Sequence, residues 1–169
     1  MASAIAANIS RALLKRVQVF GAAQTPAVVV KDSNLRDPLD QATELECLQF
    51  KFNAAKQGQR RRGTIVMAVG YEVHAWSKRA EERTDQKTDR HMVIGSLVED
   101  MIQDLDLEVK DYVDGAPAAT IGVLQTIDTS LHFRDKSNRI FGSSVDYSVE
   151  APTSMQAVVV VSALLIQGV

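Results

Sequence analysis

Apolar residues recur at steps of three and four positions near the start of the chain, which predicts an amphipathic helix over residues 2–17. Its stripe is Ile5, Ile9, Ala12, Leu13 and Val17, and Gly21 is expected to follow the helix end. A second helical pattern follows the charged connector 78–87, and Thr88 is its expected N-cap. Its expected buried stripe is Ile94, Leu97, Val98, Met101, Ile102 and Leu105.

Alternating apolar and polar positions predict five strands, at about residues 27–30, 45–52, 64–76, 121–133 and 145–149. Pro26 places the first of them near a sheet edge. The strongest pattern is 64–76, where one face carries Ile65, Met67, Val69, Tyr71, Val73 and Ala75. Loops are expected at 32–40 and 53–63.

This element order predicts an α+β two-layer sandwich, with two helices on one face of a mainly antiparallel sheet of about five strands. Residues 1–150 are expected to form one domain, and 151–169 an apolar arm. The run AVVVVSALLI at 157–166 is about half as long as a membrane-spanning helix requires. It fits a strand buried on both faces or a strand given to a neighbouring subunit. As an assembly arm, it would make contacts through Val158, Val160, Leu164 and Ile166.

Composition restricts the class of protein but does not indicate a function. The chain has 169 residues, 46% of them hydrophobic, and a net charge of −2. These values are ordinary for a globular protein and exclude a strongly cationic nucleic-acid binder. One cysteine, Cys47, excludes an internal disulfide and a thiolate zinc cluster. The first 31 residues contain four basic residues and no acid, a pattern also typical of transit peptides, although an ordinary helix is favoured.

Candidate catalytic chemistry is sparse, and we expect neither an enzyme nor a cofactor or metal site. The sequence has no glycine-rich phosphate loop and no G-x-S-x-G elbow. His74, His91 and His132 lack metal-binding spacing, and each is expected to be packed or solvated.

Charge is segregated along the chain. Residues 56–90 contain nine basic and five acidic side chains, including the triplet Arg60, Arg61 and Arg62. Residues 99–114 contain seven acids and one lysine, and the acidic face is assigned to Glu99, Asp100, Asp104, Asp106 and Glu108. The two zones are either solvated faces or the two sides of a head-to-tail contact between copies. Phosphate binding by the arginine triplet is less favoured, because no aromatic residues surround it.

Several stretches resemble the tail terminator family of long-tailed phages, also called minor tail or tail completion proteins. The similar parts are a helix, ISRALLKRV, a proline-led strand, PAVVVK, and the long strand TIVMAVGYEVHAW followed by the helix VIGSLVEDMIQDL. A strand pair, LQTIDTSLHFRDKS and FGSSVDYSVEA, ends in a Y-x-V pattern at Tyr147 and Val149. The resemblance covers about residues 5–150 and rests on architecture rather than on an invariant motif.

The resemblance implies a virion protein that assembles in the host cytoplasm into a ring, usually a homohexamer, at the head-proximal end of the tail tube. Such a ring ends tube polymerisation and joins the tail to head connector or neck proteins. On this basis we hypothesise that Arg60, Arg61 and Arg62 contact the tube or connector, and that the acidic face meets a neighbouring subunit or lines a lumen through which DNA passes. No membrane partner is expected.

Two other functions remain open from the sequence. A head-side neck or head-closure protein also forms rings, but it binds the portal adaptor. A small α+β ligand-binding or regulatory domain would need a concave pocket on the polar strand face and no ring.

Overall fold

The computed structural model describes residues 2–32, 35–57, 65–79, 82–113, 116–134, 140–141 and 154–167. They form α1 (Ala2–Ala23), β1 (Val29–Lys31), β2 (Glu46–Gln57), β3 (Ile65–Ser77), α2 (Arg90–Gln103), β4 (Asp106–Val113), β5 (Ala116–Arg134), β6 (Ile140–Phe141) and β7 (Met155–Gln167). The α+β class with two helices is therefore confirmed. The expected strand at 145–149, with Tyr147 and Val149, lies outside the described residues.

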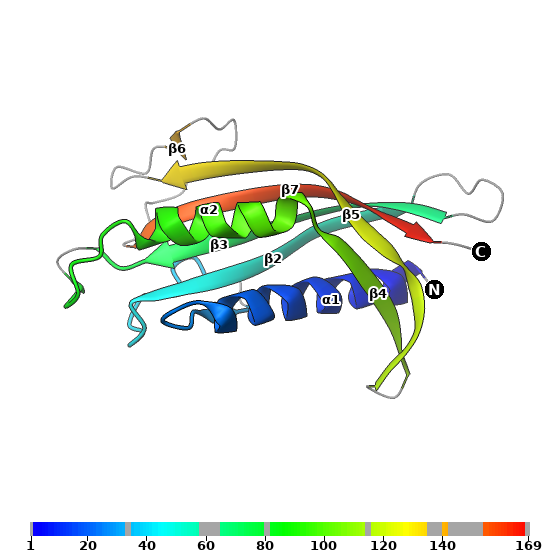
Figure 1. Ribbon diagram of the computed structural model, residues 1–169, viewed down its shortest axis with the longest axis horizontal. Coiled ribbons are helices and arrows are strands. Elements are labelled where there is room, and N and C mark those ends of the chain that lie inside the picture. Colours follow the sequence, from blue (N-terminus) through cyan, green and yellow to red (C-terminus); the bar gives the residue numbers. More distant parts are fainter. Residues whose placement is uncertain are drawn as a thin grey trace.

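The described strands form one mixed, curled sheet in the order β1-β2-β3-β7-β5-β4, with β6 paired to β5 (Figure 1). β1 runs parallel to β2 at one edge, as Pro26 indicated, and the other paired strands are antiparallel. The sheet has more strands than the five expected, because β4 and β6 were not predicted and the C-terminal segment joins the sheet.

The prediction that residues 151–169 form an arm is wrong for the described part, 154–167. β7 lies in the middle of the sheet and pairs with β3 from Met155 to Gln167 and with β5 from Gln156 to Ile166. Val159 and Leu165 are fully buried, so the strand supplies part of the core of its own subunit. The domain therefore extends past residue 150. Of the two interpretations of this run, a strand buried within the sheet is the one observed.

Both helices pack on the same face of the sheet and share one apolar core (Figure 1). α1 contributes Ile9, Leu13 and Val17, and α2 contributes Ile94, Val98 and Ile102. These side chains meet the odd-numbered face of β3 and β7, which includes Tyr71, Val73, Val159 and Val161. Helix packing thus leaves the opposite face of the sheet, called the reverse face below, without a helix.

Two details of the helices differ from the sequence expectations. α1 continues to Ala23, and Gly21 lies inside it, where a Cβ would come within 2.4 Å of the Val28 carbonyl oxygen. The chain therefore needs glycine there for the close approach of the segment leading into β1. The N-cap of α2 is Asp89 rather than Thr88, and its side chain makes no capping hydrogen bond.

Candidate interaction surfaces

The predicted acidic residues lie on two consecutive elements. Asp100 and Asp104 are exposed at the C-terminal end of α2, and Glu99 is half-buried beside them. Asp106 and Glu108 are exposed on β4, which follows α2 after two residues. We call these five residues the acidic surface. The structure thus places all the predicted acids on one stretch of α2 and β4.

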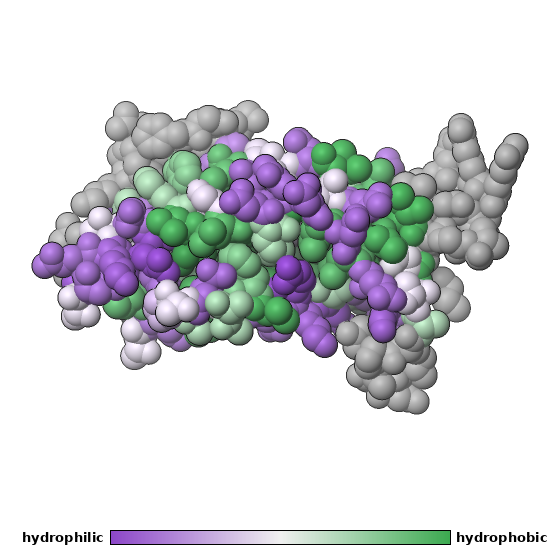
Figure 2. Space-filling model, in the orientation of Figure 1, coloured by the Kyte–Doolittle hydropathy of each residue, from purple (hydrophilic) through white to green (hydrophobic). Residues whose placement is uncertain are grey.

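The outer side of α2 combines these acids with exposed apolar residues. Val93 and Leu97 are 41% and 43% exposed, and they precede Asp100 and Asp104 on the same side of the helix, at steps of four, three and four residues. We call these four residues the α2 stripe. Leu97 was predicted to be buried, and that prediction is wrong. Figure 2 shows apolar side chains over the N-terminal half of α2 and hydrophilic ones over its C-terminal half.

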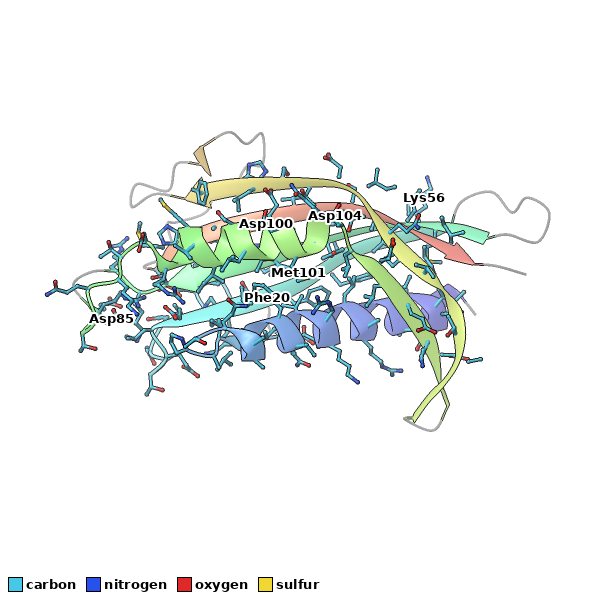
Figure 3. All side chains as sticks on the ribbon, in the orientation of Figure 1. Phe20, Lys56, Asp85, Asp100, Met101 and Asp104 are labelled. Atoms are coloured by element: carbon cyan, nitrogen blue, oxygen red, sulfur yellow. The ribbon has the colours of Figure 1, made fainter. Side chains whose placement is uncertain are left out.

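The side of α2 that faces α1 is different in character. Met101 lies on that side, and Phe20 of α1 lies opposite it (Figure 3). Both side chains are partly buried against the core. Asp100 and Asp104 lie on the side of α2 away from α1 (Figure 3). The carboxylates therefore face solvent rather than the contact between the helices.

A cationic groove lies between α1 and β4. It has a volume of about 360 Å³ and is lined by Ala12, Lys15, Arg16, Val19, Leu107, Glu108 and Lys110, which we call the α1–β4 groove. Asn8 Nδ2 donates a hydrogen bond to Asp111 Oδ1 over 2.8 Å and ties α1 to β4 beside it. Among the described lining residues three cations outnumber one carboxylate, so the groove favours an acidic occupant.

Two basic side chains of residues 78–90 do not contribute to an exposed basic zone, as the sequence had suggested, but form bonds within the subunit. Arg83 is 7% exposed and donates two hydrogen bonds of 2.7 Å to Asp85, one of 2.8 Å to Ser77 Oγ and one of 3.3 Å to Glu46. Arg90 also donates to Glu46. Hydrogen bonds from the Arg83 guanidinium hold the pKa of Asp85 well below its usual range. These hydrogen bonds hold the connector in place. Because Arg83 and Arg90 are paired with carboxylates, they add little to the positive charge of the surface.

The cations that remain on the helix side were not singled out from the sequence. Lys15 and Lys110 are exposed and Arg16 is half-buried. The available signal was the absence of acids from the first 31 residues, so that α1 contains three basic residues and no acidic one. Arg60, Arg61 and Arg62 lie outside the described residues, so their predicted contact is not placed.

The reverse face of the sheet carries the four residues assigned to the arm. Val158, Val160, Leu164 and Ile166 point to this face of β7; Val158 is buried, Val160 and Leu164 are half-buried, and Ile166 is 39% exposed. Val123 pairs with Ile166 across the strands and is 37% exposed, and Ile127 is 61% exposed. These side chains make the end of the reverse face near Ile166 an apolar surface.

At its other end, the reverse face buries polar residues under the loop that precedes β2. Gln49 Nε2 donates to the Leu35 carbonyl over 2.7 Å, and its Oε1 accepts from Trp76 Nε1 over 3.1 Å. His74 lies 2.5 Å from Gln156 Nε2 through its Nδ1. Burial makes this cluster part of the structural core rather than an accessible pocket.

One pair on the reverse face has the residue types of a nucleophile and a base. His132 Nε2 lies 3.0 Å from Ser130 Oγ. Among the described residues His132 Nδ1 has no hydrogen-bond partner, so none of their carboxylates orients the imidazole as a catalytic triad requires. The pair therefore stays a local contact between neighbours on β5. Cys47 is fully buried, and burial raises the pKa of its thiol to about 12, which keeps it protonated.

Within the described ranges, no group of three His, Cys, Asp or Glu side chains is placed to hold a metal ion. None of the helices described is long and apolar enough to cross a membrane. No family model matches the sequence, and no curated protein matches it.

Proposed function

We propose that the protein is a non-catalytic structural subunit of a phage virion, which assembles into a ring at the head-proximal end of the tail tube. The ring, of six copies, ends tube polymerisation and offers the surface on which the head connector joins the tail. The helices and sheet form the two-layer core of each subunit. The sequence resemblance suggests this place in the virion, and the surface chemistry suggests the assembly.

The observation that carries the proposal is the separation of opposite charges on the helix side of the subunit. The α1–β4 groove carries three cations beside Glu108, whereas Asp100 and Asp104 at the C-terminal end of α2 and Asp106 at the start of β4 are acidic. A closed ring needs two different surfaces on each subunit that complement each other. Charge complementarity gives such a contact its register and suppresses wrong pairings.

A ring at the tail end also needs surfaces for other proteins. The apolar end of the reverse face, with Val123, Ile127 and Ile166 exposed, fits a protein partner because a water-facing apolar patch favours association. In this proposal the tail tube or the connector binds there, together with Arg60–Arg62. Acidic residues left facing the lumen would let DNA pass without adhering.

Native mass spectrometry of the purified protein, alone and mixed with tail-tube protein, tests the proposal. We expect a closed ring of about six copies that binds tubes. A ring that binds a portal adaptor and ignores tubes would instead identify a head-side neck protein. A monomer at all concentrations that binds neither would contradict the ring and favour a ligand-binding domain.

A variant tests the partner contact separately. Replacing Arg60, Arg61 and Arg62 with alanine should leave the ring mass unchanged and weaken co-sedimentation with tubes. Lys87→Ala, which removes an exposed cation from the connector before α2, is the control and should sediment as the unaltered protein does. Normal tube binding by the triple variant would remove these arginines from the proposed contact.

A further inference from the structure

We propose that the α2 stripe of one copy occupies the α1–β4 groove of a second copy, and that this is the contact which joins subunits. The inference rests on the proposed function in one respect, namely that copies of the chain associate. It assigns the basic partner of the acidic surface to α1 and β4, whereas the sequence pointed to residues 56–90.

The groove offers the two properties that would bind the α2 stripe, namely positive charge and an exposed apolar side chain. Lys15, Arg16 and Lys110 supply positive charge, and the single carboxylate, Glu108, already accepts a hydrogen bond from Thr120 Oγ1. Val19 lines the same groove and is 53% exposed. A helix that presents apolar and acidic groups together would cover the valine and pair with the cations.

The α2 stripe presents those groups in order along one side. Val93 and Leu97 occupy the first half, and Asp100 and Asp104 the second, so that the stripe is about 16 Å long at 1.5 Å per residue. The residues of α1 that line the groove, from Ala12 to Val19, span about 10 Å by the same measure. The stripe is therefore long enough to fill the groove with both its apolar and its acidic part.

The position of the acids on α2 is an independent reason to expect a cationic partner. Asp100 and Asp104 lie at the negative end of the helix dipole, where carboxylates are disfavoured and basic residues are preferred. The last turn of α2 has no basic residue to offset them. The groove of a second copy would supply the missing positive charge. A second copy is the occupant that fits best, because the chain itself carries both complementary surfaces.

Charge exchange tests the contact directly. One variant carries Asp100→Lys and Asp104→Lys, and the other carries Lys15→Glu and Arg16→Glu. We expect each variant alone to associate at least tenfold more weakly than the unaltered protein in sedimentation velocity. Mixing the two should restore assemblies, because each then offers the charge that the other lacks. Raising the salt concentration should weaken the unaltered assembly.

Two controls separate this contact from general effects of charge and hydrophobicity. Asp40→Lys with Asp128→Lys reverses two exposed acids away from α2 and should leave association unchanged. For the apolar part, Leu97→Ser should weaken association, whereas Met92→Ser should not. Met92 is as exposed as Leu97, at 43%, but lies on another side of the same helix. Circular dichroism verifies that each variant is folded.

The outcomes distinguish this contact from the ring itself. Loss of association in both charge variants and recovery on mixing would support the contact. A ring that forms equally well with all the variants would overturn the contact and leave the proposed function standing. Assembly that stops at pairs, but responds to the exchange as described, would support the contact and overturn the ring. A protein that stays monomeric would overturn both.

Discussion

Acidification should destabilise the protein through His91, whose side chain is 1% exposed in the first turn of α2. Neither ring nitrogen has a hydrogen-bond partner in the part of the chain that the structure describes. Burial lowers the pKa of His91 from 6.5 to about 4, while nearby Asp89 acts in the opposite direction and Arg83 adds to the lowering. The positive end of the helix dipole also disfavours the imidazolium.

The sign of the effect follows from linkage. In the unfolded chain His91 binds its proton near its ordinary pKa, but in the folded protein only near pH 4. Stability is therefore intact above about pH 6.5 and is lost as the pH falls toward 4. These two pKa values correspond to a loss of about 2 kcal/mol between pH 7 and pH 5, and of about 3 kcal/mol near pH 4.

Urea unfolding at pH 7, 6 and 5 measures this loss, with His91→Leu as the test variant. Leucine fills a similar volume and leaves no buried ring nitrogens, so we expect unchanged or higher stability at pH 7. The variant should lose about 2 kcal/mol less than the unaltered protein between pH 7 and pH 5. Met92→Leu introduces leucine at the exposed position next to His91 without removing an imidazole; it is the control and should keep the original pH dependence. Parallel stability curves for His91→Leu and the unaltered protein would refute the reasoning.

Three further predictions concern the fold. Arg83→Ala should lower the free energy of urea unfolding by about 3 kcal/mol, because it leaves Glu46 without one of its two cationic partners and removes a buried network. Gly95→Ala should cost about 1–3 kcal/mol despite the better helix propensity, because the new Cβ would lie 2.8 Å from the Cβ of Ala157 on β7. Removing residues 155–169 should abolish cooperative thermal unfolding, because the sheet loses a central strand.

Each of these predictions has a control or a contradicting result. Lys87→Ala removes an exposed cation and should change stability by less than about 0.5 kcal/mol. Ser96→Ala adds no atoms at an exposed position next to Gly95 and should not destabilise α2. A shortened chain, ending at Ser154, that still unfolds cooperatively would mean that β7 acts as an arm after all.

The two helices and the long strand could be predicted because their apolar residues recur at regular helical or strand spacing and gather on one face. In β3 every second residue from Met67 to Ala75 is buried in the core, as the alternation indicated. In α2 the residues Ile94, Val98 and Ile102 are buried as expected. Leu97 was misplaced because hydrophobicity alone does not distinguish a core residue from one at an interaction surface.

The sequence analysis did not predict β4 and left β7 ambiguous, for opposite reasons. β4 has only Leu107 and Val109 as alternating aliphatic residues among acids, so its charge hid the strand pattern. β7 is apolar on both faces, and such a run reads equally well as a buried strand or as a segment given to a neighbour. Its pairing with β3 and β5 shows that β7 is a buried strand of its own sheet. The local sequence does not indicate which distant strands a segment will pair with.

Counting charged residues along the sequence identified the acidic surface but not the cations of the α1–β4 groove proposed to bind it, and the positions of the charges in the structure explain why. The acids of 99–108 lie largely at the surface, where Asp100, Asp104 and Asp106 are exposed. Arg83 and Arg90 instead meet Glu46, a residue far earlier in the chain, and are neutralised inside the fold. α1, which has no acid of its own, thereby provides cations for the proposed contact. Folding thus places a group of cations on α1 and β4 that the charge count of residues 56–90 did not include.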